Sequence, residues 1–322
     1  KKIKRMVAVG TAILMTLSLA GCGIGSDSVK LGAAGVGGGY YAFSNAFAQI
    51  ASSENEDLDF EVKATAGSTA NIRLLSDGYV DMAIAQADLV DAAYNGTGAT
   101  DKKRYRGYSA VASLYTEACQ IVVRSDSGID SLDDLQGKKI SVGEEESGTQ
   151  RNAEQILKMT GLVESLVDTV NLDYVDAANE LKSGQIDAFF CTAGIQTSVI
   201  EELSKECDVK LIGIDDKCRD RLKSVYGFYT DYTIPAGTYE GQTQDVVTLG
   251  VRAVLLARDD MDEKIVEELT GLLFEHAQDI QYSIALTFQI DESEAVKNVT
   301  IPFHDGAKAY YQKKGIEIPA EQ

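Results

Sequence analysis

The chain has 322 residues, 44% of them hydrophobic, which is enough to build two domains that each have a core. Its 50 acidic and 30 basic residues give a formal net charge of −20, which argues against nucleic acid or an anionic lipid surface as a partner. With two histidines and five cysteines that form no C-x-x-C pair, a zinc-type site is not expected, and we predict neither a metal nor a cofactor.

The first 21 residues have the pattern of a bacterial secretion signal. Basic residues lead into an apolar stretch at residues 6–20, which is too short and too interrupted to span a bilayer. Residues 19–22 (LAGC) have the form of a lipobox, in which Cys22 is acylated after cleavage. The alternative is a plain secretory signal with an incidental cysteine. We predict a lipoprotein signal peptide at residues 1–21, a tether at residues 22–28, and an extracytoplasmic protein anchored to the bacterial membrane by lipid at Cys22.

Strands and helices alternate in the part of the chain that follows the tether. Strands are expected at residues 29–31, 60–65, 80–85 and 109–115, the last continuing through residues 116–124. Amphipathic helices are expected after the glycine-rich turn at residues 35–39 and after the turn at residues 66–71. Each helix would therefore begin where a strand has just ended, with its first N–H groups unpaired.

The glycine-rich turn does not match a nucleotide-binding motif. A G-x-G-x-x-G fingerprint that starts at Gly35 would need its third glycine at Tyr40, and no Walker lysine follows. The turn is either a tight connection or a cradle where a small anionic or polar ligand approaches bare backbone at a helix N-terminus. The same construction recurs later, where the loop at residues 143–149 opens another helix. This recurrence favours the ligand-binding interpretation.

The later part of the chain repeats the alternation of strands and helices. Strands are expected at residues 139–142, 171–175, 186–191, 209–214 and 246–257, and helices near residues 132–135, 150–160, 177–181, 264–274 and 306–314. The aromatic-rich segment at residues 226–237 either packs in a core or between lobes, or forms a stacking platform for a ligand. The long strand at residues 246–257 is suited to cross back to the first half of the chain.

These elements predict an α/β fold with two lobes and a parallel-type sheet in each. Lobe I would comprise residues 29–120 plus 251–322 and lobe II residues 121–250, joined by hinge strands near residues 117–124 and 246–258. Ligands of open α/β sheets lie beyond the carboxyl ends of the strands, so a solute held by both lobes would lie in a cleft between them. The predicted ligand-binding residues at these ends are Gly39, Tyr40, Tyr41, Ser68, Thr69, Asn71, Gln86, Asp88, Ser147, Gly148, Thr149, Gln150, Thr192, Ala193 and Gly194.

Two charged residues and the cysteines leave alternatives open. Asp88 could pair with a solute amine and Arg73 with a solute carboxylate, or each could form a salt bridge or a solvated surface charge. In an oxidising compartment Cys207 and Cys218 could form a disulfide. Cys119 and Cys191 lie in apolar strands and are at least as well interpreted as free buried thiols.

Two other classes of function compete with a solute receptor. Cys191 lies near a strand end and could be a nucleophile in an enzyme built on the same fold. Neither His276 nor His304 falls in a predicted cleft loop, so we predict that the protein is not an enzyme. The second alternative is an adhesive surface lipoprotein whose cleft has no ligand.

The chain resembles the TAXI-type solute receptors of TRAP transporters. The segments that carry the resemblance are, in chain order, residues 37–41, 67–75, 80–88, 147–149, 187–194, 233–239, 251–256 and 301–307. Each segment alone is a weak signal, but the ordered set is specific and covers nearly the whole chain after the signal. The resemblance implies a type II periplasmic-binding-protein fold of the Venus-flytrap kind.

The resemblance also implies a partner and a class of solute. Such a receptor delivers a small polar solute, often a carboxylate and with glutamate or glutamine as examples, to TRAP-type permease subunits driven by an ion gradient. The sequence departs from the family pattern at Gln150, where many relatives carry a basic residue, and at Val36, where threonine is common. Without a guanidinium at position 150, an amide or hydroxyl ligand is favoured over a carboxylate.

Overall fold

The computed structural model describes residues 28–98, 102–163, 165–284 and 290–319. The predicted signal peptide, the acylation site at Cys22 and all of the tether except Ser28 lie outside these residues. None of the helices in the described ranges is long and apolar enough to cross a membrane.

The first lobe begins with three strands that are each followed by a helix. The strands are β1 (Val29–Gly32), β2 (Phe60–Lys63) and β3 (Met82–Gln86), paired in parallel in the order β2-β1-β3. The helices are α1 (Gly39–Glu54), α2 (Ser68–Ser76) and α3 (Ala87–Asn95). The chain returns to this lobe through α8 (Glu263–Glu275), α9 (Ala277–Ser283) and α10 (Asp305–Lys314).

The second lobe repeats this construction. Its strands are β5 (Lys139–Ser141), β6 (Asp168–Val170), β7 (Ala188–Ala193), β8 (Val209–Leu211) and β9 (Thr230–Ile234), and β5 pairs in parallel with both β6 and β7. Its helices are the 3-10 turn η1 (Asp133–Leu135), α4 (Gly148–Thr160), α5 (Tyr174–Ser183), α6 (Ser198–Glu206) and α7 (Asp216–Val225).

One predicted strand of this lobe is wrong. Residues 171–175 do not form a strand, because β6 ends at Val170 and a helix starts shortly after. Asp173 is the N-cap of that helix, and its carboxylate accepts a hydrogen bond from the N–H of Asp176 at 2.8 Å. Such a cap satisfies an orphan donor and stabilises the helix start. As a result Tyr174 begins helix α5.

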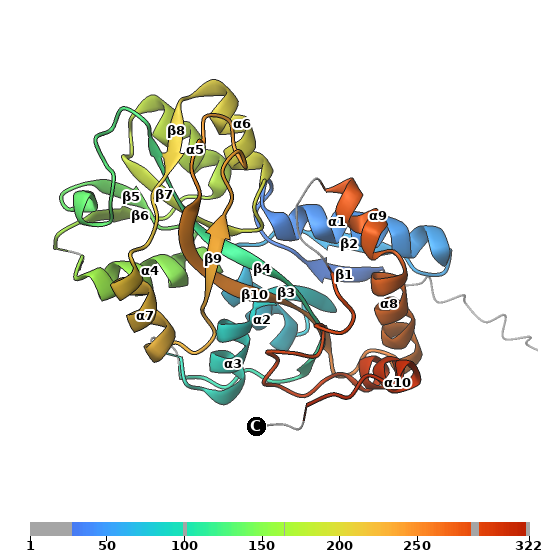
Figure 1. The fold of residues 1–322 in the computed structure, drawn as a ribbon. Helices are drawn as coiled ribbons and strands as arrows, with labels where there is room; N and C mark the ends of the chain where they lie inside the picture. The colour runs from blue at the N-terminus through green and yellow to red at the C-terminus, as the bar shows by residue number, and fades with distance from the viewer. Residues whose placement is uncertain (1–27, 99–101, 164, 285–289, 320–322) are drawn as a thin grey trace, which may run out of the picture.

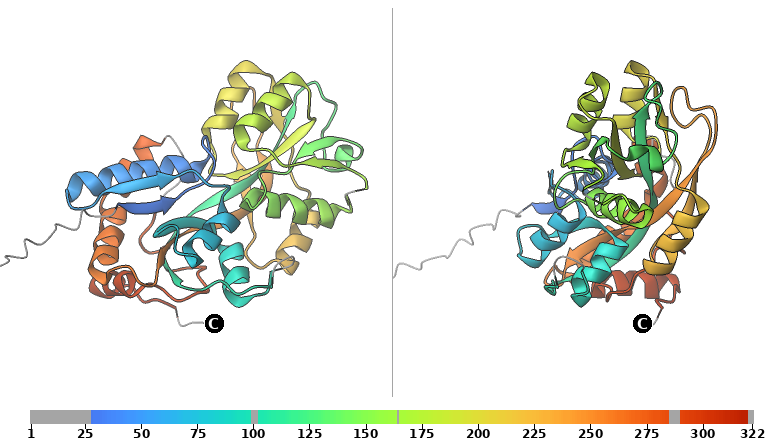
Figure 2. Two further views of the ribbon diagram at one scale, coloured as in Figure 1. Left: turned by 180° about the vertical axis from the view of Figure 1, so that it is seen from behind. Right: turned by 90° about the vertical axis from the view of Figure 1, so that its left-hand side faces the viewer.

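Two long strands, β4 (Tyr108–Arg124) and β10 (Val246–Arg258), join the lobes (Figures 1 and 2). They pair antiparallel with each other, β10 pairs antiparallel with β3, and β4 pairs antiparallel with β7. One mixed sheet in the order β2-β1-β3-β10-β4-β7-β5-β6 therefore runs through both lobes. The prediction of parallel strands is correct for β1, β2 and β3 and for β5, β6 and β7, whereas β8 and β9 pair antiparallel with the connecting strands β4 and β10.

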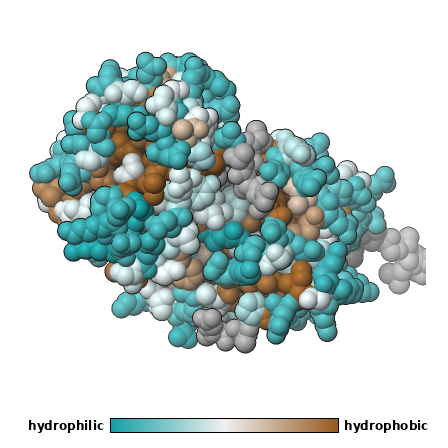
Figure 3. Space-filling view, viewed as in Figure 1, coloured by the Kyte–Doolittle hydropathy of each residue, from teal (hydrophilic) through white to brown (hydrophobic). Residues whose placement is uncertain are grey.

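The buried side chains form separate cores on the two sides of this connection. One large cluster includes Phe43, Phe47, Tyr115 and Tyr311, and the other clusters draw on residues between 118 and 251. We use lobe I for the part around the large cluster and lobe II for the rest. The residue boundaries given above for the lobes stay a prediction. Hydrophilic side chains cover most of the face seen in Figure 3, with hydrophobic ones in separate patches.

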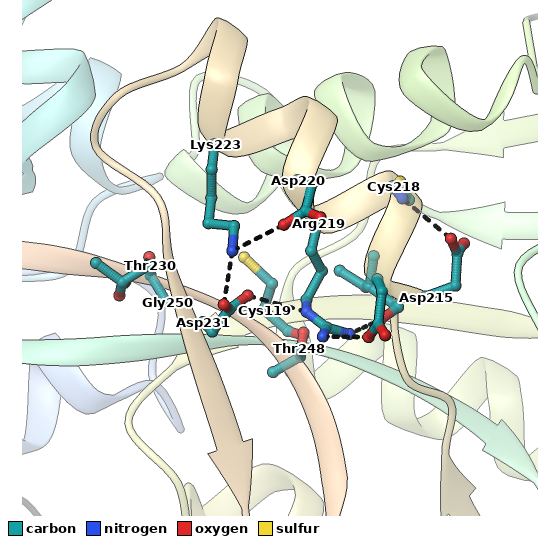
Figure 4. A network of polar contacts seen from close by, with 12 residues as sticks. Cys119, Asp215, Cys218, Arg219, Asp220, Lys223, Thr230, Asp231, Thr248 and Gly250 are labelled. Carbon is teal, nitrogen blue, oxygen red and sulfur yellow. Dashed lines mark hydrogen bonds and ion pairs between the residues drawn. The ribbon is translucent and has the colours of Figure 1, made fainter.

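Helix α7 is attached to strand β9 by an ion-pair network. Asp231 accepts hydrogen bonds from Arg219 Nε at 2.9 Å and from Lys223 Nζ at 2.6 Å, and Lys223 also pairs with Asp220 (Figure 4). In the neighbouring aromatic-rich segment, Tyr229 is buried and accepts a hydrogen bond from Asn152 at 2.8 Å. This tyrosine therefore packs inside lobe II, as one of the two interpretations of that segment expects.

The four cysteines in the described residues, Cys119, Cys191, Cys207 and Cys218, are all free thiols. The disulfide that Cys207 and Cys218 could form is absent from this structure.

Candidate functional site

A small cavity of about 40 Å³ lies between the lobes. Lobe I lines it with Ala34, Gly35, Gly38, Gly39, Tyr40, Ala66, Gly67, Ser68, Gln86 and Glu117. Lobe II lines it with Glu144, Ser147, Gly148, Thr149, Asp173, Tyr174 and Thr192. Except for Glu117, these residues follow strands or lie at strand ends, where ligands of α/β sheets bind.

The structure brings part of the predicted residue set to this cavity and places the rest elsewhere. The residues that line it are Gly39, Tyr40, Ser68, Gln86, Ser147, Gly148, Thr149 and Thr192. The predicted residues that do not line it are Tyr41, Thr69, Asn71, Asp88, Gln150, Ala193 and Gly194. Asn71 instead holds the sheet, because its amide donates to the carbonyl of Ile84 at 2.8 Å. Thr69 and Gln150 line a neighbouring groove of about 340 Å³.

Sequence reasoning did not select four polar residues of the cavity, Glu117, Glu144, Asp173 and Tyr174. Tyr174 was missed because residues 171–175 have the composition of a strand. Glu117 gives a signal that could have been used, since a single acid stands within the otherwise largely apolar strand β4. Acids are almost never fully buried unless they have a partner, so such a residue marks a special environment.

Two helices begin at opposite walls of the cavity. Helix α1 starts at Gly39 and has no side-chain cap among the described residues. Helix α4 starts at Gly148, after the N-cap Ser147, whose hydroxyl accepts a hydrogen bond from the N–H of Gln150. The N–H groups in the first turn of a helix have no intrahelical partner, and the helix dipole adds partial positive charge there. Both walls therefore offer hydrogen-bond donors to an anionic or carbonyl oxygen.

The floor of the cavity is a buried polar group formed by Tyr40, Gln86 and Glu117. Glu117 is 2% exposed, and its Oε2 accepts a hydrogen bond from the Tyr40 hydroxyl at 2.6 Å. Burial raises the pKa of Glu117 to about 8, against the hydrogen bonds of Tyr40 and Gln86, which act to lower it. The acid is therefore mostly protonated and neutral at pH 7. Gln86 is also 2% exposed, and its Oε1 has no partner among the described residues.

The place of Glu117 follows from the crossing of the lobes by β4. Within β4, Glu117 pairs with Val251 of β10, and the next residue, Ala118, already pairs with Ala193 of β7 in lobe II. Gln86 ends β3 and pairs with Ala253, also on β10. The acid thus lies where the strand ends of the two lobes face each other.

The lobe II wall is held together by Thr149, Tyr174 and Thr192. The Thr149 hydroxyl accepts a hydrogen bond from the N–H of Thr192 at 3.1 Å and shares one with the Tyr174 hydroxyl at 2.6 Å. The Tyr174 hydroxyl also donates to the carbonyl of Thr192 at 3.0 Å. These bonds connect helices α4 and α5 to the end of β7.

The lobes are in direct contact around the cavity. The carbonyl of Glu146 accepts hydrogen bonds from the N–H groups of Thr69 and Ala70 at 3.1 and 3.2 Å, so lobe II caps helix α2. The Glu146 carboxylate forms a bidentate ion pair with Arg73, at 3.1 and 2.7 Å. On the other side, the Gly37 carbonyl accepts a bond from Ser198 Oγ at 3.1 Å. The structure is therefore a closed form, and Arg73 bridges the lobes instead of lining the cavity.

Cys191 does not have the environment of a catalytic nucleophile. It is fully buried, it does not line the cavity, and burial raises the pKa of its thiol far above the usual range. A reactive cysteine needs an accessible thiolate. Asp88 also lies outside the cavity, and burial raises the pKa of its carboxyl to about 6. In the described ranges, His, Cys, Asp and Glu side chains form no group that could hold a metal ion.

The model of the NMT1-like family matches residues 31–315. The chain belongs to the NMT1-like family. This is a family of periplasmic solute-binding proteins.

Solved structures of other proteins show the same fold. MatC of Rhodopseudomonas palustris, solved with bound malate, has a TM-score of 0.56 at 14% identity, covering 80% of this chain and 87% of MatC. A protein of Bordetella bronchiseptica RB50 has a TM-score of 0.54 at 18% identity, covering 91% of this chain and 83% of that protein. A putative L-cystine ABC transporter of Listeria monocytogenes has a TM-score of 0.52 at 14% identity, covering 82% of this chain and 98% of that chain. The predicted periplasmic-binding-protein fold is thereby confirmed.

In this NMT1-like protein, replacing Thr149 with valine is expected to destabilise lobe II by about 1–3 kcal/mol. The change keeps the shape of the side chain but leaves the buried N–H of Thr192 without an acceptor, and that cost is typical of an unsatisfied buried group. Urea unfolding measures the effect. Thr160→Val is the control, because the Thr160 hydroxyl only bonds carbonyls of its own helix. Equal stability of both variants and the parent would contradict the assigned role.

Removing the ion pair between the lobes is expected to favour an open form. The side chains of Arg73 and Glu146 are 39% and 40% exposed, so their pair contributes at most about 1 kcal/mol. Arg73→Ala and Glu146→Ala should each increase the radius of gyration of the ligand-free protein in small-angle scattering. Lys205→Ala is the control, since it removes a surface pair within one helix. A radius of gyration that stays at the wild-type value in both ion-pair variants would show that the bridge does not hold the lobes together.

Proposed function

We propose that this protein is an extracytoplasmic receptor that captures a small polar solute between its lobes. The observation that carries the proposal is a cavity lined by strand ends and helix N-termini from both lobes, in a member of a solute-binding family. A solute in that cavity would touch both lobes at once. It would therefore stabilise the closed form relative to the open one.

We propose that the solute is an amino acid such as glutamate or glutamine, or a small carboxylate. The amides at the starts of helices α1 and α4 suit an oxygen that carries negative charge. Tyr40, Ser68, Thr149 and Tyr174 add hydroxyl oxygens that can accept, since Tyr40 and Tyr174 already donate to Glu117 and to the Thr192 carbonyl. Malate bound to MatC supports the class of small polar solutes for this fold.

Binding by closure requires that the solute prefer one form of the protein. A ligand held equally well by both forms shifts no population. We propose that the solute docks on lobe I, and that donors of lobe II engage as β4 and β10 flex. A micromolar receptor needs only about 8 kcal/mol in total, and desolvated hydrogen bonds of about 1–3 kcal/mol each supply that without covalent chemistry.

We further propose that the receptor delivers its solute to the permease subunits of a TRAP-type secondary transporter. The ordered set of motifs shared with TAXI-type receptors supports this partner. Uptake by cells that carry the receptor and its permease should stop when the ion gradient is dissipated and continue when cellular ATP is depleted. Uptake that follows ATP and ignores the gradient would instead assign the receptor to an ABC transporter.

The lipid anchor is a separate part of the proposal. Cys22 would be acylated and would tie the receptor to the membrane surface. Cells grown with a labelled fatty acid should incorporate the label into the wild-type protein, and Cys22→Ser should abolish the label. Labelling that persists in the variant would overturn the assignment of Cys22.

Native mass spectrometry of the gently purified protein tests the receptor function most directly, because a bound solute adds its own mass. A thermal-unfolding screen over amino acids, dicarboxylates and sugars complements it. A ligand at 100 to 1,000 times its dissociation constant should stabilise the protein by about 2–4 kcal/mol. No retained mass together with unchanged melting across the library would favour an adhesive surface lipoprotein.

A further inference from the structure

The floor of the cavity contains one buried hydrogen-bond acceptor that no described residue satisfies. Gln86 Oε1 is buried and has no partner among the described residues. The Glu117 carboxyl lies beside it and has its hydrogen bond from Tyr40. An unpaired buried acceptor lowers the stability of the protein, so a ligand that brings a donor to this point recovers that cost.

Among the described residues, those that line the cavity include three acids and no lysine, arginine or histidine. Glu117 lies at the floor, and Glu144 and Asp173 come from lobe II. Two cations that could have balanced them are engaged elsewhere, since Arg73 pairs with Glu146 and Arg252 Nε donates to Ser113 at 3.0 Å. A solute with only negative charge would be repelled by the carboxylates and attracted only by the helix N-termini.

We propose that Glu117 and Gln86 form the subsite for an ammonium group of the solute, and that this subsite selects amines over the same molecules without the nitrogen. The inference rests on the proposed receptor function and specifies which solutes it accepts. The ammonium donates to Gln86 Oε1 and to the Glu117 carboxylate. The carboxylate of a zwitterionic solute faces the helix starts at Gly39 and Gly148, on the walls of the same cavity.

Binding of an ammonium at this floor releases a proton. The groups that interact with Glu117 electrostatically or by hydrogen bonds include the neutral side chains of Tyr40, Tyr115, Tyr174, Gln86, Cys119 and Cys191, and the carboxyl of Asp88. With no cation among them, the free site keeps a proton on Glu117 at pH 7. An ammonium supplies the missing positive charge, so Glu117 ionises and its proton passes to the buffer, while the solute stays protonated. An uncharged or purely anionic solute leaves that proton in place.

Calorimetry with matched solute pairs tests the inference. The probes are glycine, L-alanine, L-glutamine and L-glutamate, each compared with the acid that lacks only the amine: acetate, propionate, 4-carbamoylbutyrate and glutarate. We expect the amino acid of a bound pair to bind at least tenfold more tightly. Titration at pH 7 in buffers of different ionisation enthalpy should show release of close to one proton. At pH 9 Glu117 is already mostly ionised and part of the free amino acid has lost its ammonium proton, so the release should disappear or turn into a small net uptake.

Two variants separate the role of the charge from that of the fold. Glu117→Gln keeps the size and hydrogen-bonding capacity of the side chain but cannot ionise. This variant should bind the amino acid at least tenfold more weakly than wild type and should release no proton on binding. Its affinity for the des-amino acid should stay within about twofold of the wild-type value. Asp81→Asn is the matched control, since it removes an acid at the opposite end of β3 from Gln86 and should change none of these quantities.

The outcomes distinguish this inference from the proposed function. Des-amino acids that bind as tightly as amino acids, or amino acids that bind without proton release, overturn the ammonium subsite and leave the receptor function standing. A solute without a cationic nitrogen, found by mass spectrometry in the native protein, does the same. If neither the probes nor any retained solute binds, both the subsite and the receptor function fail.

Discussion

Replacing Glu117 with glutamine is expected to make the ligand-free protein more stable than wild type above pH 8 and equally stable near pH 4. The pKa of Glu117 is about 8 in the folded protein and near 4.5 in the unfolded chain. Between these values the folded state holds a proton that the unfolded state has released, so wild-type stability falls as pH rises. Each pH unit in this window lowers the free energy of unfolding of the wild type by about 1.4 kcal/mol, or by at most about 5 kcal/mol over the whole window.

The measurement is denaturant unfolding of both proteins from pH 4 to pH 9. The difference between the two curves isolates Glu117, because other shifted groups act equally in both proteins. Among these, Asp88 has a raised pKa and His304 a lowered one. The difference should be near zero at pH 4 and grow to a few kcal/mol in favour of the variant. If the unfolding free energies of the two proteins instead differ by the same amount at every pH, Glu117 is ionised in the folded protein and the floor of the cavity is not neutral.

Adding one methyl group at Gly148 is expected to weaken solute binding about 5- to 150-fold. A Cβ built at Gly148 would lie 2.5 Å from Gln86 Cδ and 2.6 Å from both terminal atoms of that amide. Overpacking of this kind costs about 1–3 kcal/mol. Gly148 belongs to lobe II and Gln86 to lobe I, so the cost arises only when the lobes are closed, and the open form is favoured by that amount.

Calorimetry of Gly148→Ala with the solute that the native protein retains gives the change in affinity. Small-angle scattering of the ligand-free variant should show a larger radius of gyration than that of wild type. Gly227→Ala is the matched control, because a Cβ at that exposed position meets no atom within 4 Å. Unchanged affinity of the Gly148 variant would mean that the Gln86 amide moves aside freely, and that close approach of the lobes at this point is not required for binding.

Much of the fold could be predicted from the sequence because its signals are local. The periodicity of residues 29–31 and of the helix after Gly39 identifies a strand, a turn and a helix without reference to the rest of the chain. Such units pack as parallel sheets, and the carboxyl ends of parallel strands meet at one edge. That rule was enough to select Tyr40, Ser68, Gln86 and Thr149, all of which the structure brings to one cavity.

The remaining features depend on contacts between distant segments. Arg73 looked like a possible partner of the solute, but its ion pair is with Glu146, which is 73 residues away. The glycines looked suited to a close-approaching ligand, yet near Gly38 the closest approach from lobe II is the Tyr174 ring, at 3.2 Å from the position of a Cβ. A local sequence pattern does not predict which side chain of lobe II will lie opposite a given turn of lobe I.

By itself, the sequence determined the α/β class, the two-lobe organisation and the strand ends at which a solute would be held, because periodicity and turn residues act over a few neighbours. Only the tertiary structure decided that Glu117 lies at the floor of the cavity. That residue is in the middle of a strand, and its position depends on where β4 leaves the sheet partners of lobe I and takes those of lobe II. Its neutral state has the same origin, since burial by both lobes removes the water that would otherwise stabilise its charge.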